Sequence, residues 1–183
     1  MNHLQMLRRI VPAVLVLSLA ATTVFAQHEG DKKKPLSPPA TATGSIGGVT
    51  ITIDYSAPSK RDRPIMGALV PYGQVWRTGA NAATTMTTSG DLVIGGLAVP
   101  AGKYTLYTLP GEKAWKLIIN KQNGQWGTVY EEKQDIGRVD MKVEAVKPVV
   151  ETFVIAVKSG KGKTGALTFT WENLETSVTV AAK

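Results

Sequence analysis

The sequence predicts an all-β protein: a single antiparallel β-sandwich of about eight or nine strands. From Gly47 onward, hydrophobic and polar residues alternate with a period of two, which buries one face of a strand and exposes the other. Turn-forming pairs such as Gly95-Gly96 and Pro110-Gly111 separate these runs. The connections between most of the runs are too short for helical crossovers, so antiparallel pairing is expected.

The first strand is expected at Val49–Tyr55, where Thr50, Thr52 and Asp54 interrupt the apolar residues. The same alternation recurs in later segments, at 115–120, 139–143, 153–157, 167–171 and 177–180. A hairpin is predicted from Lys103–Leu109 and Ala114–Lys121, with its turn at Pro110-Gly111. Its inner face would carry large apolar side chains, namely Tyr104, Leu106, Trp115, Leu117 and Ile119.

The N-terminus has the pattern of a secretory signal peptide, residues 1–26. Arg8 and Arg9 precede an apolar run that ends with small residues at Val24 and Ala26. We therefore expect cleavage near Ala26, a periplasmic or secreted location, and contact with the membrane only during export. Residues 27–46 are rich in Pro, Ser, Thr and Gly and predict a flexible leader, which leaves 47–183 as the sandwich domain.

The composition excludes several classes of chemistry. The chain has no cysteine and therefore no disulfide, so the hydrophobic core must hold the fold together. After cleavage the only histidine is His28, within the leader, so neither a Ser-His-Asp triad nor a His/Cys metal site is expected. The formal charge of +7 includes Arg8, Arg9 and lysines of the leader, and no basic stripe with aromatic residues predicts a nucleic-acid partner.

One segment, "VPYGQVWRTGANAATTMT" at 70–87, fits neither a regular strand nor a regular helix. Arg77 offers a fork of donors for a carboxylate or phosphate, and Asn81 can both donate and accept. Tyr72 and Trp76 can stack on a ring or an apolar group. These four residues, with Arg61 and Arg63 of the preceding loop, are the candidate ligand-binding residues; no catalytic residue, metal ligand or cofactor is assigned.

The same segment also has a structural interpretation. Its apolar side chains can close one end of the core, while Arg77 and Asn81 satisfy backbone carbonyl groups of the loop. A carboxylate pair for glycoside hydrolysis stays open as well, although the spacing singles out no pair among the acids, Asp54, Asp62, Asp91, Glu112, Asp135 and Glu151. A protein-interaction module using an exposed edge strand is a further alternative.

Several runs together resemble an exported bacterial family known as domain of unknown function 2911. The resemblance rests on residues 56–127, including "LVPYGQVWRTGANAAT", "VPAGKYTLYTLPG", "WKLIINK" and the pair Trp126-Gly127. It implies an exported β-sandwich-like domain and no assigned reaction. Family members often have a glycine before the arginine of the first loop, where this chain has the run 60–63, "KRDR".

We therefore expect an exported, non-catalytic domain that binds a small polar or anionic ligand through the loop Tyr72–Asn81. The sequence does not identify the ligand, the partner or the oligomeric state. It also leaves open whether the protein is an enzyme.

Overall fold

The computed structural model describes residues 35–183. The predicted signal peptide and residues 27–34 of the predicted leader lie outside this range. In the described part, one antiparallel sheet has nine strands in the order β1-β2-β3-β6-β7-β8-β9-β4-β5. The strands are β1 (Pro39–Ile46), β2 (Val49–Ser56), β3 (Thr85–Thr88), β4 (Leu92–Ile94), β5 (Leu97–Val99), β6 (Gly102–Leu109), β7 (Trp115–Asn120), β8 (Asp135–Ser159) and β9 (Thr164–Ala182).

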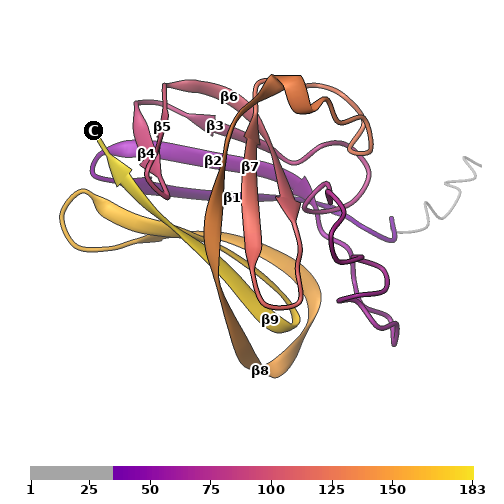
Figure 1. The fold of residues 1–183 in the computed structure, drawn as a ribbon. Coiled ribbons are helices and arrows are strands. Elements are labelled where there is room, and N and C mark those ends of the chain that lie inside the picture. Colours follow the sequence, from indigo (N-terminus) through magenta and orange to yellow (C-terminus); the bar gives the residue numbers. More distant parts are fainter. Residues whose placement is uncertain (1–34) are drawn as a thin grey trace, which may run out of the picture. The chain divides into compact units, whose positions relative to one another are not determined.

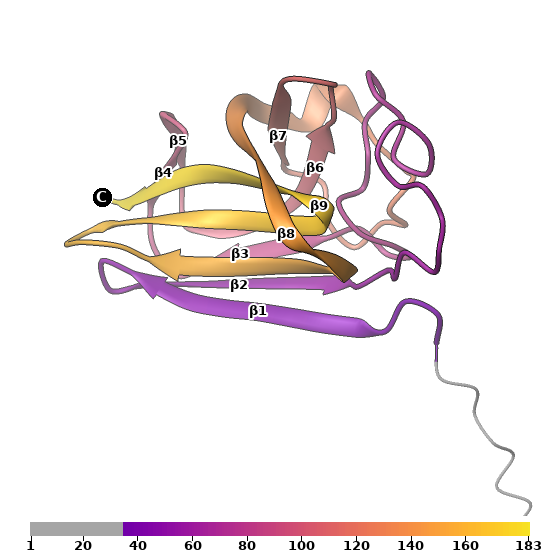
Figure 2. The same ribbon diagram turned by 90° about the horizontal axis from the view of Figure 1, so that it is seen from below.

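The all-β, antiparallel prediction is confirmed, and the sheet folds over itself as in a sandwich (Figure 1). The long strands β8 and β9 produce this arrangement. The first part of β8 pairs with β7, and the rest pairs with β9, with a register shift between Ala145 and Val150. The second part of β8 lies along β1, where Ser159 Oγ donates a 2.6 Å hydrogen bond to the carbonyl of Ser45 (Figure 2). In the described residues the only helix is the 3₁₀ turn η1 (Glu132–Gln134), and no helix there is long and apolar enough to cross a membrane.

The prediction of a flexible leader up to residue 46 is wrong for its last eight residues, which form β1. β1 pairs with β2 along its whole length, from Pro39 opposite Ser56 to Ile46 opposite Val49. Ala42 and Ile46 point into the core, so the Thr- and Pro-rich composition conceals an alternating strand. The sheet therefore begins before Gly47.

The predicted strands are present, but two pairs of them are continuous. Segments 139–143 and 153–157 both belong to β8, and segments 167–171 and 177–180 both belong to β9. The predicted hairpin is confirmed as β6 and β7, with Leu106 opposite Ile119 and Thr108 opposite Leu117. All five inner-face residues expected there are buried in the core.

The long connection between β2 and β3, residues 57–84, crosses one end of the sandwich. Its backbone is tied to distant strands by isolated bridges: Trp76 pairs with Thr108 of β6, and Ser59 pairs with Thr152 of β8. Trp76 and Thr108 exchange two backbone hydrogen bonds, of 2.8 and 2.9 Å. Because these bonds replace those that water would otherwise supply, the connection has a fixed path without being a strand.

Candidate functional site

Trp76 closes this end of the core and also forms the wall of a pocket. Its ring stacks on Trp171 of β9 with a centroid distance of 5.9 Å and an interplanar angle of 15°, and meets the edge of Phe153 at 5.2 Å. Such aromatic pairs add stability beyond the area they bury. Trp76 is only half-buried, so part of the indole stays open to solvent.

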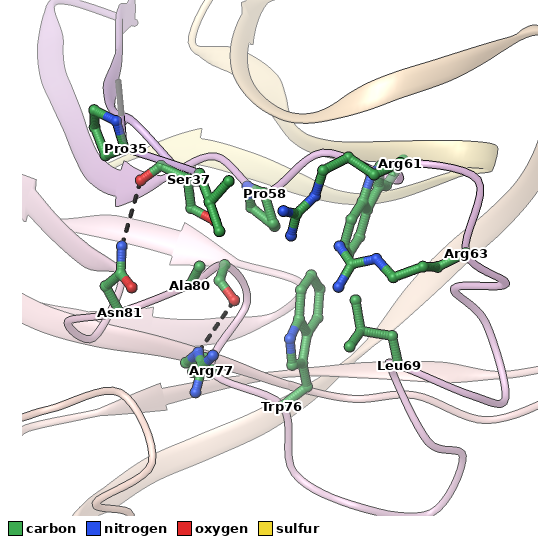
Figure 3. Close-up of a pocket in the computed structure, with 13 residues that line it drawn as sticks. Pro35, Ser37, Pro58, Arg61, Arg63, Leu69, Trp76, Arg77, Ala80 and Asn81 are labelled. Atoms are coloured by element: carbon green, nitrogen blue, oxygen red, sulfur yellow. Dashed lines mark hydrogen bonds between the residues drawn. The ribbon is translucent and has the colours of Figure 1, made fainter. Parts of the chain in front are cut away.

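The pocket beside Trp76 has a volume of about 520 Å³. Figure 3 shows Arg61, Arg63 and Arg77 around it, with apolar surface from Leu69 and Pro58. No Asp or Glu of the described residues lines it. A concave site with an apolar wall and several positive groups is suited to a small anionic ligand.

Backbone carbonyl groups orient two of these arginines. Arg63 donates from Nε to the carbonyl of Lys60 at 3.0 Å and from Nη2 to that of Ser59 at 2.7 Å. Arg77 donates from Nε to the carbonyl of Gly79 at 3.3 Å. A neutral carbonyl fixes the direction of a guanidinium but does not cancel its charge. Within residues 35–183, none of the three pocket arginines forms an ion pair through its side chain.

The backbone around the arginines adopts unusual conformations. Among described non-glycine residues, five have positive φ, and four of them lie in this connection: Arg61, Asp62, Thr78 and Asn81. Thr78 is the most notable, with φ of 54°, because a β-branched side chain rarely adopts this region. The carbonyl of Thr78 accepts a 2.8 Å hydrogen bond from Thr84 Oγ1, which helps to hold the conformation. Such outliers persist where surrounding contacts impose them, and they concentrate at functional sites.

Gly127 supports the side chain of Arg77 from behind. A β-carbon at position 127 would lie 2.5 Å from Cδ of Arg77 and 2.7 Å from the carbonyl oxygen of Asn81. The backbone N–H of Gly127 donates to that same oxygen at 3.1 Å. Gly127 therefore supports the site, because only a glycine lets the Arg77 side chain run along the backbone here.

The structure brings together five of the six residues predicted from the sequence: Arg61, Arg63, Trp76, Arg77 and Asn81 all line the pocket. Tyr72 does not line it; its ring lies against Gly67 and is 39% exposed. Asn81 contributes an anchor, since its Nδ2 donates to the carbonyl of Ser37 at 3.3 Å. The structural interpretation also holds for part of the segment, because Val70 is fully buried in the core.

Sequence reasoning missed several pocket residues. Trp171 reads as an inner-face residue of a strand, and Leu36 and Ser37 were assigned to the leader. These residues reach the pocket through tertiary contacts, and no local sequence pattern indicated that they would. The association of Trp126-Gly127 with "VWRTGAN" was visible in the sequence, but its contact with Arg77 was not.

A second arginine cluster lies at the junction of β7, η1 and β8. The Asp135 carboxylate accepts hydrogen bonds from the Asn120 amide at 2.8 Å, the Tyr130 hydroxyl at 2.6 Å and Arg138 Nε at 3.1 Å. Arg138 also pairs with Glu132 at 2.8 Å. Burial, together with the hydrogen bond to Asp135, raises the pKa of Tyr130 to about 12. We name Tyr130, Glu132, Asp135 and Arg138 the paired cluster.

The acids considered for a hydrolase do not meet beside Trp76. Asp135 belongs to the paired cluster, and Glu151 accepts a hydrogen bond from the backbone N–H of Arg61 at 2.8 Å. The smaller pocket on the other side of Arg77, of about 150 Å³, is also lined without an Asp or Glu in the described chain. No group of three or more His, Cys, Asp or Glu residues in the described part is placed to hold a metal ion.

Fold and site together define a sandwich-like β domain with an arginine-lined pocket at the end closed by the β2–β3 connection. A family model described as protein of unknown function (DUF2911) matches residues 37–180, and the chain belongs to this family. Neither the comparison with curated proteins nor that with solved structures gives a significant match. The match includes β1, in agreement with a domain that starts before Gly47.

Proposed function

We propose that this domain is a non-catalytic binding protein for a small anionic ligand that carries a flat or apolar part. The observation that carries the proposal is the pocket beside Trp76, which is lined by Arg61, Arg63 and Arg77 and by no Asp or Glu of the described chain. A positive group that is oriented but unpaired is suited to an anion. The exposed part of the indole supplies the surface on which a ring can rest.

Arg77 would make the central contact. Its Nε is occupied by the carbonyl of Gly79, whereas its two Nη groups have no acceptor within residues 35–183. Both are therefore available for a two-point hydrogen bond to a carboxylate or phosphate. The contact with Gly127 keeps the side chain in place before a ligand arrives, which lowers the entropic cost of binding.

The test is ligand-induced stabilisation with benzoate, which combines one carboxylate with a flat ring. Benzoate should raise the melting temperature of the wild type in a concentration-dependent manner. Arg77→Gln should weaken benzoate binding about tenfold or more, because a charge-assisted hydrogen bond contributes about 1.5–3 kcal/mol. Without ligand, its melting temperature should stay within about 4 °C of the wild type.

Lys116→Gln is the matched control. Lys116 is an exposed cation of β7 that pairs with Asp140, away from the pocket. It should leave the benzoate response unchanged. Unfolding of the Arg77→Gln variant would show that Arg77 is structural, and an equal benzoate response in both variants would reject the pocket as the binding site.

We also propose that the domain acts outside the cytoplasm, after removal of residues 1–26. The basic start, apolar run and small-residue exit of this segment support the proposal. Cell fractionation should find the mature chain in the periplasm or medium. Deletion of residues 2–26 should retain it in the cytoplasm.

A further inference from the structure

We infer that the ligand carries two anionic groups separated by a flat apolar spacer, which lies along Trp76. This inference rests on the proposed function and specifies its ligand class. It follows from how the charges of the pocket are distributed, from the donors left on each arginine, and from the apolar surface between them.

The positive charges fall into two groups. In Figure 3 the guanidinium of Arg77 lies on one side of the Trp76 indole, and those of Arg61 and Arg63 lie on the other. The groups also come from different parts of the connection, one directly after Trp76 and the other in the turn that follows Pro58. A single carboxylate bound beside Arg77 would leave the other two charges without a counter-ion.

Each group keeps donors for a ligand. A guanidinium has five N–H donors. Arg63 donates one N–H from Nε and one from Nη2 to carbonyl groups, and Arg77 donates only its Nε N–H within the described residues. Arg61 is held through its backbone N–H by Glu151, and its side chain makes no hydrogen bond in the described part of the chain. Both sides of the indole therefore offer charged N–H groups to an acceptor.

The surface between the two groups is apolar. Trp76 lies in the middle, and Leu69, Pro58 and Trp171 complete the wall of the pocket. Leu69 is 45% exposed, so part of its apolar side chain is accessible in the pocket. A flat hydrocarbon spacer would cover this surface while its two ends reach the arginines. The volume of about 520 Å³ is within the range of sites for small organic ligands.

The experiment compares pairs of probes by titration calorimetry. Benzoate is paired with terephthalate, and biphenyl carboxylate with the corresponding 4,4′-dicarboxylate. One dicarboxylate should bind the wild type about tenfold or more tightly than its monocarboxylate, because the second carboxylate gains charge-assisted contacts. The two spacer lengths keep the test independent of the exact separation of the arginines.

Arg61→Gln separates the two ends of the site. This side chain is exposed, so the variant should fold. It should remove most of the advantage of the dicarboxylate and weaken the monocarboxylate, held mainly by Arg77, by a clearly smaller factor. Equal weakening of both probes would overturn the inference.

The outcomes also distinguish this inference from the proposed function. If a monocarboxylate binds through Arg77 and neither dicarboxylate binds more tightly, the two-anion ligand is rejected and the proposed function stands. If none of the four probes binds, both are rejected.

Discussion

The two arginine clusters of this protein differ in what surrounds their charge. In the paired cluster, Arg138 contacts the carboxylates of Asp135 and Glu132 and the hydroxyl of Tyr130. At the pocket, the side-chain N–H groups of Arg63 and Arg77 donate only to backbone carbonyl groups among the described residues. Both arrangements fix the direction of a guanidinium, but only the first neutralises it. Under the proposed function, the first cluster holds the fold and the second keeps its charge for a ligand.

The two clusters also use different supporting structure. The paired cluster joins two residues of β8, Asp135 and Arg138, to Tyr130 and Glu132 of the short connection before it, and Asp135 lies opposite Asn120 at the end of β7. The pocket is built on a connection with positive-φ residues, tied to strands by isolated bridges. Irregular backbone on a rigid scaffold is the usual place for a binding site.

The largest effect on stability is expected for Asp135→Ala. The side chain of Asp135 is only 9% exposed. Its removal takes away the acceptor of the Tyr130 hydroxyl and one of the two acceptors of the fully buried Asn120 amide, which keeps its hydrogen bond to the carbonyl of Glu131. Each unsatisfied buried donor costs about 1–3 kcal/mol, so the free energy of unfolding should fall by about 2–4 kcal/mol. Urea-induced unfolding measures this change.

Asp140→Ala is the control for this substitution. Asp140 is 83% exposed and pairs with Lys116 on the surface, so its removal should cost less than about 1 kcal/mol. Benzoate binding should be retained in both variants, because neither residue lines the pocket. Loss of binding in Asp135→Ala alone would show that the two clusters are coupled. It would contradict separate roles for them in stability and in binding.

Gly127→Ala should have the next largest effect, and it should act on the pocket. The added β-carbon meets Arg77 and the carbonyl of Asn81 at distances that real contacts do not adopt. We expect a loss of about 1–3 kcal/mol in stability, as for other overpacked sites, together with loss of benzoate binding.

A double-mutant cycle tests the cause. In the Arg77→Ala background the contact with Cδ of Arg77 is removed and that with the carbonyl of Asn81 remains, so Gly127→Ala should cost less there than in the wild type. Equal costs in both backgrounds would mean that the glycine does not act through Arg77.

The sequence was sufficient where one face of a strand is buried. The alternation in β2 and in the β6–β7 hairpin predicted their limits to within one residue and also their inner faces, because burial on one side imposes that pattern. β1 was missed because only Ala42 and Ile46 of its residues are buried, and its small polar residues are also typical of linkers. The continuity of β8 was missed because Pro148 interrupts the pattern, and a proline within a run argues against a single strand.

The sequence predicted only part of the site, because local pattern reveals some of the pocket residues and not others. Trp76 and Arg77 stood out because their segment matched no regular element, whereas Trp171 has the expected place of a core residue in β9. Whether its ring also borders a pocket depends on Trp76, which reaches it from a distant part of the chain. Local pattern does not encode that contact.

Tyr130→Phe should have a smaller effect, which depends on pH. A tyrosine is neutral when protonated, and the folded-state pKa of about 12 lies above the unfolded value of about 10. The folded protein therefore holds this proton more tightly than the unfolded chain. The resulting stabilisation is complete below pH 10 or so and is lost as the pH rises towards about 12.

Unfolding of the wild type and of Tyr130→Phe should be compared across this range. At neutral pH the variant should be less stable by about 1 kcal/mol, because it loses the hydrogen bond to Asp135. Above pH 10 or so, the wild type should lose this advantage. Tyr107, whose pKa burial also raises, contributes to both proteins and cancels in the difference. A difference that is constant with pH would show that Tyr130 does not hold its proton through this cluster.

The smallest effect, and the most direct contrast between the clusters, is expected from one substitution in each. Arg138→Gln removes the partner of two carboxylates and should cost about 1 kcal/mol in stability. Arg61→Gln removes an exposed charge whose side chain forms no ion pair among residues 35–183, so stability should stay within about 0.5 kcal/mol. Added salt should reduce the difference in stability between the two variants, because it screens the charge interactions that each arginine makes. If Arg61→Gln destabilised the protein as much as Arg138→Gln, Arg61 would stabilise the fold as Arg138 does. Its charge would then not be available to bind a ligand, as the proposed function requires.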